Sequence, residues 1–172
     1  KVPRCLCENK KEVFREIVTF VDASLKGYGA VVYLKCTCED GSRSSRLVSS
    51  KRKVAPLTPM TGPRLELVAA ILGPTQNILR ALEMNMCDVT FYSDSADVLW
   101  WIRGCGREFR PFVANRISEI QMYSNPAQWQ HVRTEQNPAD CCTRGATPSE
   151  LAESTFWWNG PAWLVQDTSQ WP

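Results

Sequence analysis

Hydrophobic and polar positions divide the chain into short apolar runs and longer segments with helical periodicity. Residues 17–22 are almost continuously β-branched or aromatic, which predicts a buried strand. Further strands are predicted over residues 28–38, 45–50, 88–93 and 128–133. The first three strands follow one another without a helix, and a polar turn at residues 39–42 joins the second to the third. We therefore expect an antiparallel meander at the start of the fold.

Apolar residues recur at helical spacing elsewhere in the chain. Helices are predicted over residues 64–82, 95–102 and 112–123, and from Asn137 onward. Pro63 stands at a predicted first helical position, and Pro74 is expected to kink the long first helix. Residues 51–63 contain three prolines and predict a loop. The resulting order of strands and helices predicts an α/β fold.

The composition is that of a globular chain. Its 172 residues suit one domain, and a hydrophobic fraction of 44% with seven tryptophans favours a packed core over disorder. No apolar stretch is long enough to cross a bilayer. A net charge of +2 does not by itself indicate a polyanionic partner, but basic residues gather at Lys51, Arg52 and Lys53 and at Arg103, Arg107, Arg110 and Arg116.

The eight cysteines do not require a disulfide framework in a chain of this size. Cys5 and Cys7, like Cys36 and Cys38, have C-x-C spacing rather than the commoner C-x-x-C spacing of zinc sites. On a strand, Cys36 and Cys38 would face the same way, so a shared zinc site and ordinary thiols are both open interpretations. Reduced thiols would indicate a cytosolic type of compartment.

Four carboxylates occupy positions that could converge. Asp22 ends the first strand, Asp94 follows the fourth strand, Glu66 lies in the first turn of the first long helix, and Asp140 lies near the start of the last helix. Ligands bind at the carboxyl ends of strands in α/β sheets. Two divalent cations about 3.5–4 Å apart, held by several carboxylates, catalyse in-line displacement at phosphorus. Oxygen ligands suit Mg²⁺, so the set predicts a magnesium site rather than a zinc site.

Each of these residues also has an ordinary structural interpretation. Asp22 can be a turn residue, and Glu66 can complement a helix dipole. Asp94 or Ser95 can cap the helix that follows, and Asp140 can satisfy backbone N–H groups in a helix that Asn137 caps. His131, the single histidine, is more often structural than catalytic in such a position. No carboxylate decides the matter alone.

Several motifs in the correct order resemble the ribonuclease H domain of BEL/Pao-class LTR retrotransposons. They are KVPR at residues 1–4, DASLKGYGAVVY at 22–33, PRLEL at 63–67, SDS at 93–95, NPADCCTRG at 137–145 and WWNGPAWL at 157–164. The resemblance covers essentially the whole chain. It implies a ribonuclease H-like fold, with a five-stranded mixed sheet whose first three strands are antiparallel and with helices on both faces.

The resemblance implies endonucleolytic hydrolysis of the RNA strand of RNA–DNA hybrids during reverse transcription. Asp22, Glu66, Asp94 and Asp140 would be the catalytic residues and the ligands of two Mg²⁺ ions, which Mn²⁺ could replace. Ser95 matches a residue that touches the nucleic-acid backbone in retroviral relatives. We add the basic side chains Lys51, Arg52, Lys53 and Arg133 as candidate nucleic-acid contacts.

The chain departs from some relatives of this family. A loop before the last helix carries a catalytic histidine in retroviral relatives, whereas residues 133–138 contain none and His131 lies earlier. Residues 104–110 are too few for the basic extra helix found in some members. Substrate binding would then depend on the basic residues named above or on an upstream reverse transcriptase.

Other nucleases share this type of fold but differ in the order of their carboxylates. An integrase or transposase core would place its glutamate after both aspartates, whereas Glu66 comes between Asp22 and Asp94. A proofreading exonuclease would carry D-x-E in the first strand, whereas this chain has Ser24 two residues after Asp22. The remaining alternative is a catalytically silent domain that binds hybrids or connects its neighbours, including a relic adopted by a host.

The resemblance also predicts how the chain is divided. Residues 1–16 would be a leader from the polymerase region, 17–148 the ribonuclease H domain, and 149–172 a Trp-rich extension toward an integrase. The tryptophans of that extension would pack back on the domain or offer a surface to a neighbour. The chain does not begin with Met, so we expect a piece of a polyprotein that acts in a cytoplasmic virus-like particle, in a reducing compartment.

Overall fold

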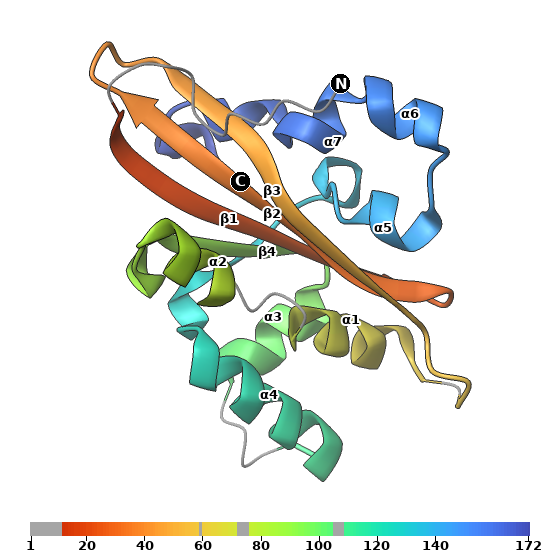
Figure 1. Ribbon diagram of the computed structural model, residues 1–172. Helices are drawn as coiled ribbons and strands as arrows, with labels where there is room; N and C mark the ends of the chain where they lie inside the picture. Colours follow the sequence, from red (N-terminus) through yellow and green to blue (C-terminus); the bar gives the residue numbers. More distant parts are fainter. Residues whose placement is uncertain (1–11, 59, 72–75, 105–108) are drawn as a thin grey trace.

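A five-stranded mixed sheet forms the centre of the computed structural model, which describes residues 12–58, 60–71, 76–104 and 109–172 (Figure 1). Its strands are β1 (Glu12–Ser24), β2 (Gly27–Cys38), β3 (Arg43–Val54), β4 (Val89–Ser93) and β5 (Trp129–His131), in the order β3-β2-β1-β4-β5. The pairs β1–β2 and β2–β3 are antiparallel, whereas β1–β4 and β4–β5 are parallel. The predicted mixed sheet with an antiparallel first half is confirmed.

Helices cover both faces of this sheet, as predicted. On one side lie α1 (Gly62–Ile71), α2 (Gln76–Leu82), α3 (Ala96–Arg103) and α4 (Pro111–Tyr123). On the other lie α5 (Asp140–Arg144), α6 (Pro148–Glu153) and α7 (Thr155–Asn159), as Figure 1 shows. Single 3₁₀ turns link several of these elements, at Met86–Asp88, Pro126–Gln128, Thr134–Gln136, Ala162–Val165 and Thr168–Gln170. Among the helices described here, none has the length and apolar character needed to cross a membrane.

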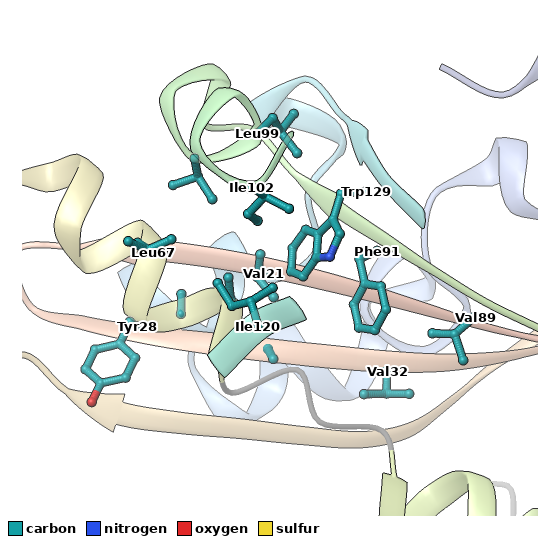
Figure 2. Packing of buried hydrophobic residues seen from close by; sticks show 14 of the residues in the cluster. Val21, Tyr28, Val32, Leu67, Val89, Phe91, Leu99, Ile102, Ile120 and Trp129 are labelled. Carbon is teal, nitrogen blue, oxygen red and sulfur yellow. The ribbon is translucent and has the colours of Figure 1, made fainter. Parts of the chain in front are cut away.

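Strand alternation separates two apolar cores. Ile17 and Val21 of β1 belong to the core on the α1–α4 side. Figure 2 shows Val21 packed there with Leu67, Ile102 and Trp129. The alternate residues Val18 and Phe20 point the other way, into a cluster with Tyr33, Tyr92, Trp157, Trp163 and Leu164. Both clusters contain fully buried side chains. Asp22 continues the second series, and it therefore lies on the face that α5 covers.

The Trp-rich extension belongs to this second core. Trp157 and Trp163 are buried, and the phenol of Tyr33 donates a hydrogen bond of 2.9 Å to the backbone carbonyl of Trp157. Of the two interpretations of the extension, packing back on the domain is the one observed for these two tryptophans.

Some element boundaries differ from the prediction. β1 begins at Glu12 rather than at residue 17, which places residues 12–16 in the sheet rather than in a linker, because backbone pairing with β2 continues to Cys38. β3 runs to Val54, so Lys51, Arg52 and Lys53 lie on a strand and not in a loop. As an edge strand it pairs through its backbone while its side chains at this end stay exposed, so it shows no apolar pattern.

The helices also differ in detail. The segment predicted as one kinked helix is present as α1 and α2; the expected kink at Pro74 lies outside the described residues. The segment KVPR, Cys5, Cys7 and Arg107 lie outside them as well.

The cysteine prediction needs one correction. Cys36 is disulfide-bonded, so it is not a reduced thiol, and a zinc site shared with Cys38 is wrong because a disulfide sulfur is not a thiolate ligand. Cys38, Cys141 and Cys142 are free thiols.

Candidate metal centre

Strand register brings two aspartates side by side at the carboxyl edge of the sheet. β1 and β4 are parallel, with Val21 opposite Ser93, and the next residues along the two strands are Asp22 and Asp94. Glu66 joins them from α1, where Leu65 and Leu67 on either side of it are buried against the sheet. Carboxylate oxygens of Asp22, Glu66 and Asp94 all lie within 4.8 Å of one another. The three residues come from separate elements that the two cores hold in place.

Burial and mutual repulsion make this cluster electrostatically unfavourable without a cation. Asp22 is 4% exposed. Desolvation raises its pKa to about 6, and the charges of Asp94 and Asp140 add to the rise while a hydrogen bond from Thr143 opposes it. Desolvation raises the pKa of Glu66 to about 9, with further contributions from the charges of Asp22 and Asp94. Both carboxyls are therefore protonated more readily than in water.

The cluster fits a hard divalent cation. Glu66 Oε2 is buried and has no hydrogen-bond partner in the part of the chain described here, so one acceptor inside the cluster is unsatisfied. All the converging ligand atoms are carboxylate oxygens, which Mg²⁺ and Mn²⁺ accept. A bound cation would satisfy this acceptor and offset the repulsion.

Asp140 lies beside the cluster rather than in it. It is the first residue of α5, and Arg144 one turn later donates from Nε to its Oδ1 at 2.7 Å. The group of three converging carboxylates does not include it, although its charge raises the pKa of both Asp22 and Glu66. Its role as a fourth ligand stays a prediction.

The NPADCCTRG segment holds the cluster from the α5 side, through residues to which sequence reasoning gave no such role. Asn137 Nδ2 donates to the carbonyl of Val21 at 2.9 Å and to Asp94 Oδ1 at 3.4 Å. Thr143 Oγ1 donates to Asp22 Oδ2. Asn137 and Thr143 each lie three residues from Asp140 in this motif, which was the available sequence signal. The sequence alone did not show that their partners are Val21, Asp94 and Asp22.

The predicted cap at Asn137 needs a correction. Its Oδ1 accepts from the N–H of Ala139 at 3.1 Å, but α5 itself begins at Asp140, with Ala139 as the N-cap residue. The amide of Asn137 is instead used to tie the α5 side to β1 and to Asp94.

The predicted nucleic-acid contacts are distributed around the centre. Ser95 caps α3, accepting from the N–H of Val98 at 3.4 Å, so the capping interpretation holds for this residue. Arg52 pairs with Gly29, which in turn pairs with Asp22, so Arg52 lies in the same row of the sheet two strands from the cluster. Lys51, Lys53 and Arg133 are exposed. His131 is exposed too, at the end of β5.

The sequence matches the Pao retrotransposon-like RNaseH-like domain over residues 1–95, more than half of the chain. The chain belongs to this family. A comparison of this Pao RNase H-like domain with curated proteins finds no match.

Ribonucleases H are among the solved structures similar to this Pao RNase H-like domain. RNase H1 from Halobacterium salinarum is 15% identical, with 75% of this chain and 95% of that chain covered and a TM-score of 0.46. The N-terminal RNase H domain of a Mycobacterium tuberculosis protein is 15% identical, with 76% of this chain and 92% of that chain covered and a TM-score of 0.49. LC11-RNase H1, solved in complex with an RNA/DNA hybrid, is 19% identical, with 79% of this chain and 99% of that chain covered and a TM-score of 0.45.

Proposed function

We propose that this Pao RNase H-like domain hydrolyses the RNA strand of RNA–DNA hybrids during reverse transcription of a retrotransposon. The observation that carries the proposal is the convergence of Asp22, Glu66 and Asp94 within 4.8 Å at the carboxyl edge of the sheet. Membership in an RNase H-like family supports this reaction class, and the unsatisfied acceptor of Glu66 supports a cation there.

The roles of the residues follow from their positions. Asp22, Glu66 and Asp94 would hold one divalent cation, and Asp22 with Asp140 would hold a second. When bound, such cations supply stabilisation of charge on the phosphoryl oxygens and a lowered pKa for the attacking water. Asp22 lies on the central strand of the sheet and would be shared by both cation positions, so its orientation would matter most.

Substrate recognition would use shape and the RNA sugar. Hybrid selectivity comes from contacts to 2′-hydroxyls and from groove shape rather than from base sequence. The exposed basic residues Lys51, Arg52 and Lys53, with Ser95 and Arg133, would contact the phosphate backbone. In the polyprotein, a reverse transcriptase would precede this domain and an integrase would follow it, within a cytoplasmic virus-like particle.

The test is strand-specific cleavage by the purified chain. We expect Mg²⁺- or Mn²⁺-dependent cutting of the RNA strand of a labelled hybrid, with the DNA strand intact. Asp22→Asn and Asp94→Asn should reduce the rate by about 10²-fold or more while hybrid binding, measured by anisotropy, is retained. Asp140→Asn should cost less, because this carboxylate lies outside the group of three.

Asp97→Asn is the matched control, because Asp97 is an exposed aspartate in the first turn of α3, outside the group of three, and its change should leave cleavage unchanged. If hybrid is bound but never cut, by this chain or by a chain linked to its polymerase, the silent connector becomes the better interpretation.

A further inference from the structure

Thr143 is fully buried, yet its hydroxyl is directed at the candidate metal centre. Oγ1 donates to Asp22 Oδ2, and the side chain has 0% exposure, so Thr143 cannot contact substrate itself. The residue lies three positions after Asp140 on α5, about one helical turn along the helix.

The hydroxyl had another partner available. A threonine inside a helix usually donates to a carbonyl three or four residues earlier, and the carbonyl of Asp140 lies 3.2 Å from Oγ1. A hydroxyl has one proton, and an ionised carboxylate is the stronger acceptor. When Asp22 is ionised, the proton of Thr143 is therefore used on Asp22 rather than inside α5.

A second hydrogen bond fixes Thr143 from the opposite side. Ser24, two residues after Asp22, donates from Oγ to the backbone carbonyl of Thr143 at 3.2 Å. The end of β1 and α5 thus exchange hydrogen bonds in both directions, from Ser24 to Thr143 and from Thr143 to Asp22. Neighbouring Cys142 packs against Gly29 of β2, which leaves α5 little room to shift.

We propose that Thr143 is a positioning residue that orients Asp22 for cation binding, and that Ser24 holds Thr143 in place for this task. Each carboxylate oxygen can accept more than one hydrogen bond or cation, so the bond to Oδ2 fixes the plane of the carboxyl group and leaves capacity for a cation. The inference rests on the proposed function, since it assigns a supporting residue to the same centre. Groups that orient metal ligands in this way affect metal affinity by about 10–100-fold when removed.

The experiment measures Mn²⁺ affinity of the full chain by calorimetry and by electron paramagnetic resonance, which needs no cleavage. Thr143→Val keeps the shape and removes the hydroxyl, so we expect a loss of affinity of about 10–100-fold. Thr143→Ser restores the hydroxyl and should bind Mn²⁺ nearly as the unchanged chain does. Ser24→Ala should give a smaller loss, because it removes the bond to the Thr143 carbonyl, with the local contacts of Ser24 to Gly27 and Lys26, but leaves the hydroxyl that contacts Asp22.

Thr147→Val is the matched control. Thr147 caps α6 through hydrogen bonds with Glu150 and lies on the surface, so its loss should lower the melting temperature without changing Mn²⁺ affinity. A merely structural role for Thr143 would give the same pattern as Thr147→Val, with lower stability and unchanged affinity, and would overturn the inference.

Three outcomes separate failure of this inference from failure of the proposed function. If Thr143→Val does not fold, Ser24→Ala carries the test, and an unchanged affinity in that variant overturns the inference. If the unchanged chain binds no Mn²⁺, the proposed function fails and the inference fails with it. Normal Mn²⁺ binding by a folded Thr143→Val variant would remove the inference alone.

Discussion

Glu66 and Asp22 are held in the fold at a cost that depends on pH. Burial raises the pKa of Glu66 from 4.5 to about 9 and that of Asp22 from 3.8 to about 6. A raised carboxyl pKa means that the folded state binds protons more tightly than the unfolded chain. For Glu66 the resulting stability is fully present below pH 4.5 and is lost as the pH rises to about 9. The metal-free domain should therefore weaken across this range.

Glu66→Gln should make the metal-free domain more stable at pH 8 while abolishing cleavage. The amide stays neutral at every pH, so its advantage exists only where Glu66 would be driven toward ionisation. We expect the melting temperature to rise by about 2–4 °C at pH 8, the shift that about 1 kcal/mol produces in a domain of this size, and to change little at pH 4. Thermal unfolding of both proteins at the two pH values, in a chelator, is the measurement.

An opposite pH dependence is expected for a surface glutamate. Hydrogen bonds with Thr147 lower the pKa of Glu150, so its stabilising effect is present above its unfolded pKa and lost on acidification. Glu150→Gln should therefore cost more at pH 8 than at pH 4. Equal destabilisation by Glu66→Gln at both pH values would contradict the electrostatic account.

At the residue scale, the sequence predicted the candidate ligands better than it predicted the hydrogen bonds that hold them. The convergence of Asp22, Glu66 and Asp94 was predicted correctly, because their positions relative to strands and helices are local properties of the sequence. Thr143 was not, because its acceptor lies 121 residues away and only the docking of α5 brings the two together. Asn137 was given a cap role for the same reason, since its amide reaches Val21 across the fold.

The close packing of α5 against the sheet depends on Gly29 of β2. A Cβ built on Gly29 would lie 2.9 Å from Cys142 Cβ and 3.0 Å from the carbonyl oxygen of Lys51. Both neighbours are fixed, one by the packing of α5 and the other by β3 pairing. Glycine at this position lets α5 approach the sheet closely enough for Thr143 to reach Asp22.

Gly29→Ala should destabilise the domain by about 1–3 kcal/mol, because the added methyl group overpacks the contact with α5. Mn²⁺ affinity should fall as well, since the displaced helix carries Thr143. Gly62→Ala is the control, because nothing lies within 4 Å of its Cβ position and its effect should be within about 0.5 kcal/mol. Urea unfolding gives both values, and similar results for the two variants would argue against close packing at Gly29.

Elements with strong apolar patterns were predicted well. Strand segments that form only through backbone hydrogen bonds to a neighbouring strand were not. The central strands and α3 and α4 follow the sequence pattern closely. The length of β3 and the first five residues of β1 were missed, because backbone hydrogen bonds to a neighbouring strand extend them without apolar side chains. Such pairing depends on a partner elsewhere in the chain and leaves no local periodicity.

At the scale of the whole molecule, the sheet is buried on both faces by different parts of the chain. The C-terminal extension covers the face opposite α1–α4, and the ring of Trp163 lies 5.9 Å from Phe20 and 5.1 Å from Tyr92, between ring centroids. The extension is therefore one layer of the fold, because without it the rings of Phe20 on β1 and Tyr92 on β4 would be exposed to water.

Trp163→Ala should cost about 3–5 kcal/mol of unfolding free energy, since it removes a large buried ring from the centre of this layer. Trp100→Ala tests the same change at a residue that is 65% exposed, where we expect about 0.5 kcal/mol. Denaturant titration of the two variants separates the cases. A small cost at Trp163 would show that the extension is only loosely attached.

The exchange of hydrogen bonds between β1 and α5 also sets an order in time. Ser24 and Thr143 are 119 residues apart, whereas β1 and β2 are consecutive strands joined by a two-residue turn. Short loops close at a lower entropy cost, so the β1–β2 hairpin can form while later residues are still being synthesised. Asp22 gains its orienting hydroxyl only after residue 143 has left the ribosome, and cation binding would then mark the end of folding rather than its beginning.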